Sequence, residues 1–108
     1  MAKEQHIVDK TIAMLRTIPG SFVRKNHGGY YQQAGIPDIY FTCEAISGHS
    51  VWIELKKPGQ EPTKKQRHTL GVLTKAGCTA FWADNIRDVC ETLREIGVPF
   101  PTTTKGEQ

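Results

Sequence analysis

Two alternating stretches of the sequence place carboxylates and a lysine where they could act together. In residues 38–43 and 51–56, apolar side chains alternate with polar, charged or aromatic ones. Successive side chains of a strand point to opposite faces, so burying the apolar set leaves Asp38, Glu54 and Lys56 on the other face. Carboxylates are the ligands that Mg²⁺ and Mn²⁺ prefer. A metal ion can activate water for phosphodiester hydrolysis, and a neighbouring lysine can stabilise the transition state.

The segment between these stretches predicts a hairpin. If residues 45–49 form a five-residue loop, Glu44 pairs with Ser50, and Asp38 falls opposite Lys56 and diagonal to Glu54. Diagonal neighbours lie about 7–8 Å apart at the backbone, so two inward-reaching carboxylates could share one cation. The ordinary alternative is a solvent-facing strand on which Glu54 simply pairs with Lys56.

The remaining elements indicate how this hairpin is held. Helical spacing of apolar residues predicts a first helix from about Glu4 to Ile18, ended by Pro19-Gly20. A capping pattern and a closing Gly77 predict a second helix, and Asp84 or Asn85 is expected to cap the last one. The expected order is helix 4–18, strand 21–25, the hairpin strands, helix 63–76, strand 78–83 and helix 86–97. A mixed sheet with helices on both faces is the simplest α/β solution.

Two polar residues on otherwise apolar helical stripes each have two interpretations. Glu4 lies at the inward edge of the first helix, where it is either a site carboxylate or a frayed surface residue. Gln66 is either a site residue or the partner of Thr63 in a capping box that serves only the helix end. The pattern alone does not choose between them.

Composition narrows the class of protein. The 108 residues suffice for one modest core, and neither a long apolar run nor a secretory signal is seen, so we expect a cytoplasmic protein. Three widely spaced cysteines predict reduced thiols, without the paired spacing of a zinc site. The net charge of +3 is modest, but basic residues gather in segments 24–27 and 56–67. Two basic clusters beside an acidic constellation suit a polyanion held over a metal.

Taken in order, Glu4, Gly35-Ile-Pro-Asp38, Glu54-Leu-Lys56 and Gln66 resemble the PD-(D/E)XK nuclease pattern. More narrowly, they resemble the VRR-NUC (virus-type replication-repair nuclease) family in its stand-alone phage and bacterial form. The resemblance implies a restriction-endonuclease-like core over residues 1–97, followed by a flexible tail over 98–108. It also implies the site residues: metal at Asp38, Glu54, the Leu55 backbone carbonyl and Glu4, with Lys56 and Gln66 as further catalytic residues.

The same resemblance implies the partners. Segment 22–29 resembles the family's basic segment that approaches DNA, and the expected DNA-binding residues are Arg24, Lys25, Asn26, His27, Lys57, Lys64 and Lys65. The expected activity is Mg²⁺- or Mn²⁺-dependent, structure-selective cleavage of branched, flapped or four-way DNA in a bacterium or a phage-infected cell. A homodimer is expected, without membrane or small-molecule cofactor, and with Tyr30, Tyr31, Trp52 and Trp82 as candidate contacts. A non-catalytic nucleic-acid-binding module is the alternative. A nuclease that acts on RNA is a third interpretation, which stays open although no residue identifies a reader of the RNA 2′-hydroxyl.

Overall fold

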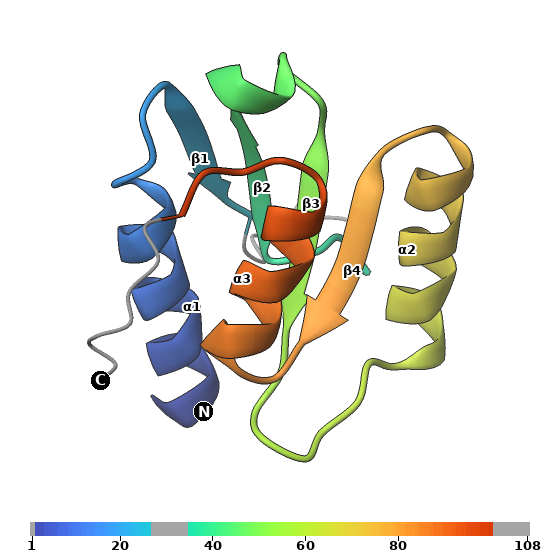
Figure 1. Ribbon diagram of the computed structural model, residues 1–108. Coiled ribbons are helices and arrows are strands. Elements are labelled where there is room, and N and C mark those ends of the chain that lie inside the picture. The colour runs from blue at the N-terminus through green and yellow to red at the C-terminus, as the bar shows by residue number, and fades with distance from the viewer. Residues whose placement is uncertain (1, 27–34, 101–108) are drawn as a thin grey trace.

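A four-stranded mixed sheet organises the described part of the chain, residues 2–26 and 35–100 of a computed structural model (Figure 1). The elements are α1 (Ala2–Leu15), β1 (Ser21–Lys25), β2 (Ile39–Cys43), the short 3₁₀ helix η1 (Glu44–Ile46), β3 (Val51–Leu55), α2 (Lys64–Lys75), β4 (Thr79–Ala83) and α3 (Ile86–Glu95). This order of helices and strands confirms the one expected from the sequence, with η1 added between the hairpin strands.

The strands lie in the order β1-β2-β3-β4. β1, β2 and β3 pair antiparallel, whereas β3 and β4 pair parallel and are joined through α2. A parallel pair needs a long crossover connection, usually a helix, and α2 with its flanking loops supplies it. The expected mixed α/β sheet is therefore present.

Helices cover the two faces of the sheet unequally. α1 contacts β1, β2 and β3, and α3 contacts β4; both helices lie in front of the sheet in Figure 1. The core lies between them and the sheet, where Leu15, Ile39, Phe41, Ile53 and Leu93 are fully buried. α2 instead packs beside β3 and β4, so it covers only one half of the other face.

Helix α1 ends at Leu15, earlier than the sequence indicated. Proline disfavours helical geometry in the residue before it, and Ile18 precedes Pro19; the chain therefore leaves the helix in a turn in which the Ile18 amide donates to the Leu15 carbonyl at 3.1 Å. Ile18 is nevertheless buried, which explains why it fitted the apolar stripe.

The end of the fold lies beyond residue 97. Val98 is buried, and Phe100 packs against the core with the Arg94 guanidinium 5.6 Å from its ring centre. Residues 101–108 of the expected tail lie outside the described residues.

Cys43, Cys78 and Cys90 are free thiols, as expected. Among the described residues, no helix has the length and apolar character needed to cross a membrane.

The hairpin register differs by two residues from the expected one. Ile39 pairs with Ile53 and Phe41 with Val51, so continuing the ladder sets Asp38 opposite Glu54 instead of Lys56. The connection is longer than a five-residue loop because η1 and a left-handed Ser47 (φ 56°) take up its residues. A shift of two residues preserves the faces, whereas a shift of one would exchange them, so the expected grouping of Asp38, Glu54 and Lys56 is retained.

Candidate active site

The two carboxylates of the candidate site lie on adjacent strands. Asp38 precedes β2 and Glu54 lies within β3, at positions that the register places opposite each other. The Leu55 backbone amide donates to Asp38 Oδ2 at 2.8 Å. This bond ties the Asp38 side chain to the neighbouring strand, because Leu55 is itself fixed by a fully buried side chain.

The segment before Asp38 is shaped for close packing. Gly35 has a backbone φ of +92°, which residues with a Cβ rarely adopt. A Cβ at this position would also lie only 2.9 Å from Thr69 Oγ1 and 3.0 Å from Lys65 Cγ on α2. Pro37 is fully buried. The Asn26 backbone amide donates to the Asp38 carbonyl at 2.7 Å, and its side-chain amide donates to the Pro37 carbonyl at 3.2 Å. Asn26 therefore positions Asp38, a role that the sequence did not reveal.

Lys56 and Gln66 are brought together by α2. Gln66 is the third residue of this helix, and its Oε1 accepts from the Thr63 backbone amide at 2.9 Å and from Lys56 Nζ at 3.4 Å. In return, Thr63 Oγ1 accepts from the Gln66 amide at 3.1 Å, which completes a capping box. Gln66 is thus both a helix cap and a neighbour of the lysine. The capping interpretation is confirmed, and the same oxygen atom also contacts Lys56, so a role in the site stays a prediction.

The donor set fits a small, hard divalent cation. Asp38 and Glu54 supply carboxylate oxygens. In an antiparallel ladder, the N–H and C=O of one residue point to the same neighbouring strand. Because the Leu55 amide points to Asp38, the Leu55 carbonyl points to the same side and can supply a third oxygen. Mg²⁺ is commonly bound through one or two carboxylates while it keeps several waters. Glu54 is only 2% exposed, and buried charges in proteins are paired or bind metals. Within residues 2–26 and 35–100, no group of three His, Cys, Asp or Glu forms a softer or larger ligand set.

The loop beyond Lys56 is anchored by a carboxylate from the end of β4. The Lys56 backbone amide donates to the Ala83 carbonyl at 3.0 Å, which extends the parallel pairing. The Gly59 amide then donates to Asp84 Oδ2 at 2.9 Å. This backbone hydrogen bond, together with one from the Asn85 side chain, lowers the pKa of Asp84. Asp84 therefore holds the loop between β3 and α2 and does not cap α3, which Asn85 does.

The expected DNA-binding residues do not share one surface. Arg24 is exposed, whereas Lys25 points to the α1 side, where its Nζ lies 3.4 Å from Asp9 Oδ1. Asn26 makes the backbone contacts given above. Lys57 is half-buried after β3, and Lys64 and Lys65 are exposed at the start of α2. His27 lies outside the described residues. Glu4 lies within α1, but its side chain is outside the described part, as are Tyr30 and Tyr31.

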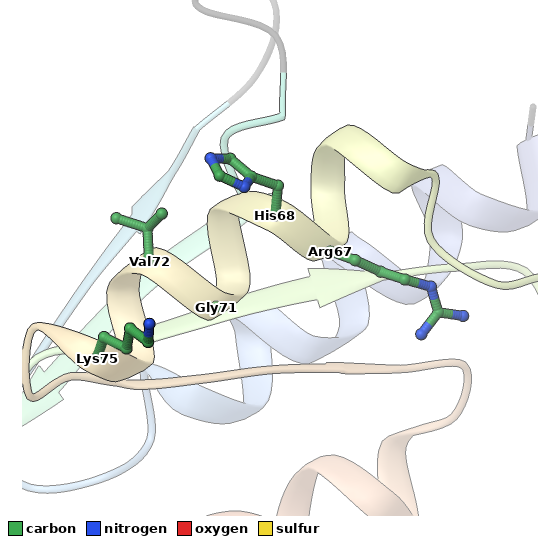
Figure 2. Close-up of a pocket in the computed structure, with 5 residues that line it drawn as sticks. All are labelled: Arg67, His68, Gly71, Val72 and Lys75. Carbon is green, nitrogen blue, oxygen red and sulfur yellow. The ribbon is translucent and has the colours of Figure 1, made fainter.

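A basic hollow on the outer side of α2 is separate from the carboxylates. Its volume is about 260 Å³, and it is lined by Arg67, His68, Gly71, Val72 and Lys75. Figure 2 shows the side chains of His68, Val72 and Lys75 spread along the helix, with Arg67 extending away from His68. At 3.6 residues per turn, this side of α2 faces away from Gln66. The hollow is therefore not the site in which Lys56 and the carboxylates meet.

An aromatic row lies on the face of the sheet that carries the carboxylates; the alternation of residues 38–43 and 51–56 had indicated this face for Tyr40 and Trp52, and only the extension of the row to Phe22 was missed. Tyr40 and Trp52 pair across β2 and β3 with ring centres 4.9 Å apart, and Phe22 of β1 lies 6.1 Å from Tyr40. The signal was present in the alternation that identified Asp38 and Glu54, because Tyr40 and Trp52 are each two residues away from one of them. Trp82, by contrast, lies under α2, with the Arg67 guanidinium 6.0 Å from its ring centre.

Solved structures with a similar fold are known. One chain named "VRR_NUC domain" aligns with a TM-score of 0.71 and 20% identity, covering 85% of this chain and 95% of its own. A "VRR_NUC domain protein" aligns with a TM-score of 0.69 and 18% identity, covering 89% and 91% respectively. No protein-family model and no curated protein matches the sequence.

The chain therefore has a mixed α/β fold, with a carboxylate pair and a lysine on one face of its sheet. Within that class, the fold is that of the VRR_NUC domain over most of the chain. The fold expected from the spaced motifs is confirmed.

Proposed function

We propose that this protein is a VRR-NUC-type, Mg²⁺- or Mn²⁺-dependent endonuclease that hydrolyses phosphodiester bonds in DNA. The observation that carries the proposal is the meeting of Asp38, Glu54 and Lys56 on one sheet face within a VRR_NUC fold. Branched or flapped DNA as substrate, and a homodimer as the active unit, belong to the same proposal. A two-fold pair of protomers would present two sites to two strands.

Each residue has a defined task in this proposal. Asp38 and Glu54, with the Leu55 carbonyl, hold the cation, and Asn26 and the Leu55 amide fix the orientation of Asp38. When bound, the metal supplies Lewis-acid stabilisation of the phosphoryl group and a water of lowered pKa. Lys56 Nζ, held by Gln66 Oε1, donates a hydrogen bond to the attacking water or to a phosphoryl oxygen. Lys57, Lys64 and Lys65 contribute phosphate contacts that carry no sequence information.

A non-catalytic nucleic-acid-binding module is the competing function. The same fold could hold DNA through its basic residues without cutting it. The intact carboxylate pair and its lysine favour catalysis, because a binding-only protein has no need to bury Glu54 beside Asp38. Cleavage that depends on a divalent cation separates the two functions.

The test is an assay of purified protein with Mg²⁺ or Mn²⁺ against linear, flapped, four-way and single-stranded DNA and against RNA. We expect cleavage of DNA that disappears in Asp38→Asn and Glu54→Gln. Exposed Glu95 on α3 provides the matched control, and Glu95→Gln should cut at the wild-type rate.

A second readout does not depend on activity. Binding of a ligand to the folded state alone stabilises it, by about 2.7 kcal/mol at a hundredfold excess over Kd. Mg²⁺ should therefore raise the melting temperature of the wild type and of Glu95→Gln, but not of the two site variants. Equal Mg²⁺ stabilisation of all four proteins, or full cleavage by either site variant, would refute the metal assignment.

A further inference from the structure

The aromatic row lies on the half of the sheet that α2 leaves open. Phe22 is 57% exposed, and Arg24, two residues further along β1 on the same face, is also exposed. Tyr40 and Trp52 are half-buried behind them. The rings meet edge to face, at interplanar angles of 66° and 68°. Each pair is a favourable aromatic contact, but internal packing does not account for the large exposed face of Phe22.

The row is continuous with the candidate site. Tyr40 follows Asp38 by two residues, and Trp52 precedes Glu54 by two. At about 3.4 Å per residue, the Tyr40–Trp52 pair lies about 7 Å from the carboxylates. Phe22 pairs with Thr42, and therefore lies one further step, about 14 Å in all, along the same face. A strand whose phosphate occupies the metal site would have its neighbouring nucleotides over these rings.

The charge on this face favours a polyanion. Arg24 pairs directly with Tyr40 across β1 and β2, so a guanidinium stands among the rings. A second copy of this chain is a poorer occupant, because a two-fold axis through the patch would bring two Arg24 side chains together. Proteins that bind single-stranded nucleic acid combine cationic groups with aromatic side chains on which bases stack.

We propose that Phe22, Tyr40 and Trp52 form a stacking platform for unpaired DNA bases next to the cleavage site. The platform rests on the proposed function, and it makes DNA with unpaired nucleotides beside the scissile phosphate the substrate of the protein. A fully paired duplex cannot use the platform, because its bases are already stacked. Flapped, forked or single-stranded DNA can.

The first test measures stacking directly. The chain has two tryptophans, so Trp82→Phe leaves Trp52 as the single tryptophan reporter. Titration with oligothymidylate in EDTA, which prevents metal-dependent cleavage, should quench Trp52 fluorescence, whereas a blunt duplex of equal charge should quench it much less. Equal quenching by both, or none by the single strand, would overturn the proposal.

The second test removes the exposed ring. Phe22→Leu keeps apolar bulk, and Phe22→Trp restores an aromatic face. As a control, Val72→Ala on α2 alters another large exposed apolar side chain (52% exposed). A stacked base is worth about 1–3 kcal/mol, so Phe22→Leu should bind labelled oligothymidylate about 5- to 150-fold more weakly by anisotropy. Phe22→Trp and Val72→Ala should bind as the wild type does. Thermal melting of each variant verifies folding, and Phe22→Trp keeps the test informative if Phe22→Leu is unstable.

The outcomes separate this inference from the proposed function. Single-strand binding that depends on Phe22, in a protein that never cleaves DNA, would support the platform and refute the nuclease. Metal-dependent cleavage with Phe22→Leu unchanged in single-strand affinity would refute the platform alone. A change from dimer to monomer in Phe22→Leu, with unchanged affinity per chain, would show that this face binds a second copy and would also overturn the proposal.

Discussion

Gln66 offers the sharpest test of the site, because one oxygen serves two purposes. Its Oε1 accepts from the Thr63 amide and from Lys56 Nζ. Gln66→Ala removes both contacts, whereas Thr63→Ala removes only the other half of the capping box, in which Thr63 Oγ1 accepts from the Gln66 amide. The two variants therefore weaken the same helix end, but only one of them releases Lys56.

The stability costs should be similar. Loss of an N-cap side chain costs about 0.5–2 kcal/mol, typically about 1, and this range applies to Thr63→Ala. Besides the long 3.4 Å contact with Lys56, Gln66→Ala loses the hydrogen bond from the exposed Thr63 amide, which is worth about 0.5–1.5 kcal/mol, and it regains a few tenths from the higher helix propensity of alanine. A change of 1 kcal/mol shifts the melting temperature of a domain near this size by about 4–8 °C. Both variants should melt several degrees lower and remain folded at 25 °C.

The cleavage rates should differ. Loss of a residue that orients a metal-site group typically costs about 10- to 100-fold, so we expect that fall for Gln66→Ala and a near wild-type single-turnover rate for Thr63→Ala. Gln66→Glu preserves the cap but pairs Lys56 with a new negative charge facing the phosphate; it should melt like the wild type and cut poorly. If Gln66→Ala and Thr63→Ala lose the same stability and the same activity, Gln66 is only a cap and the reasoning fails.

Three further predictions concern other parts of the molecule. Lys56→Ala should lose turnover but retain DNA binding, whereas Lys57→Ala should weaken binding modestly and flatten its salt dependence; indistinguishable binding and single-turnover rates would contradict this. The pKa of Asp84 is lowered, first by the hydrogen bond from the Gly59 amide. The ionised carboxylate therefore stabilises the fold at pH values above the ordinary pKa of 3.8, and this stabilisation is lost as the pH falls through the lowered pKa of the folded state. Asp84→Asn should therefore flatten the fall in melting temperature between pH 5 and pH 2, and an unchanged profile would count against it. Light scattering should give twice the 12.1 kDa chain mass; a fully active monomer would exclude the dimer.

The alternation of apolar residues and the helix-end residues in the sequence determined the helices and strands, and also the sheet face on which the candidate site residues lie. Alternation in residues 38–43 and 51–56 separated the buried Ile39, Phe41, Ile53 and Leu55 from Asp38 and Glu54. The Thr63–Gln66 capping box and Gly77 marked the ends of α2. These features are local, because side-chain direction and cap geometry depend on residues a few positions apart. They could therefore be predicted from one sequence.

Only the tertiary structure decided how these elements meet. The register of the hairpin depended on η1 and Ser47, whose conformations set the length of the connection. Packing of α2 onto β3 and β4 carried Gln66 Oε1 to Lys56. It also left Phe22 exposed while it covered Trp82, although both residues lie in strands that the sequence predicted. Such contacts join residues far apart in the chain, and the face of the sheet on which a helix settles is fixed by the packing of the whole domain, which no local pattern records.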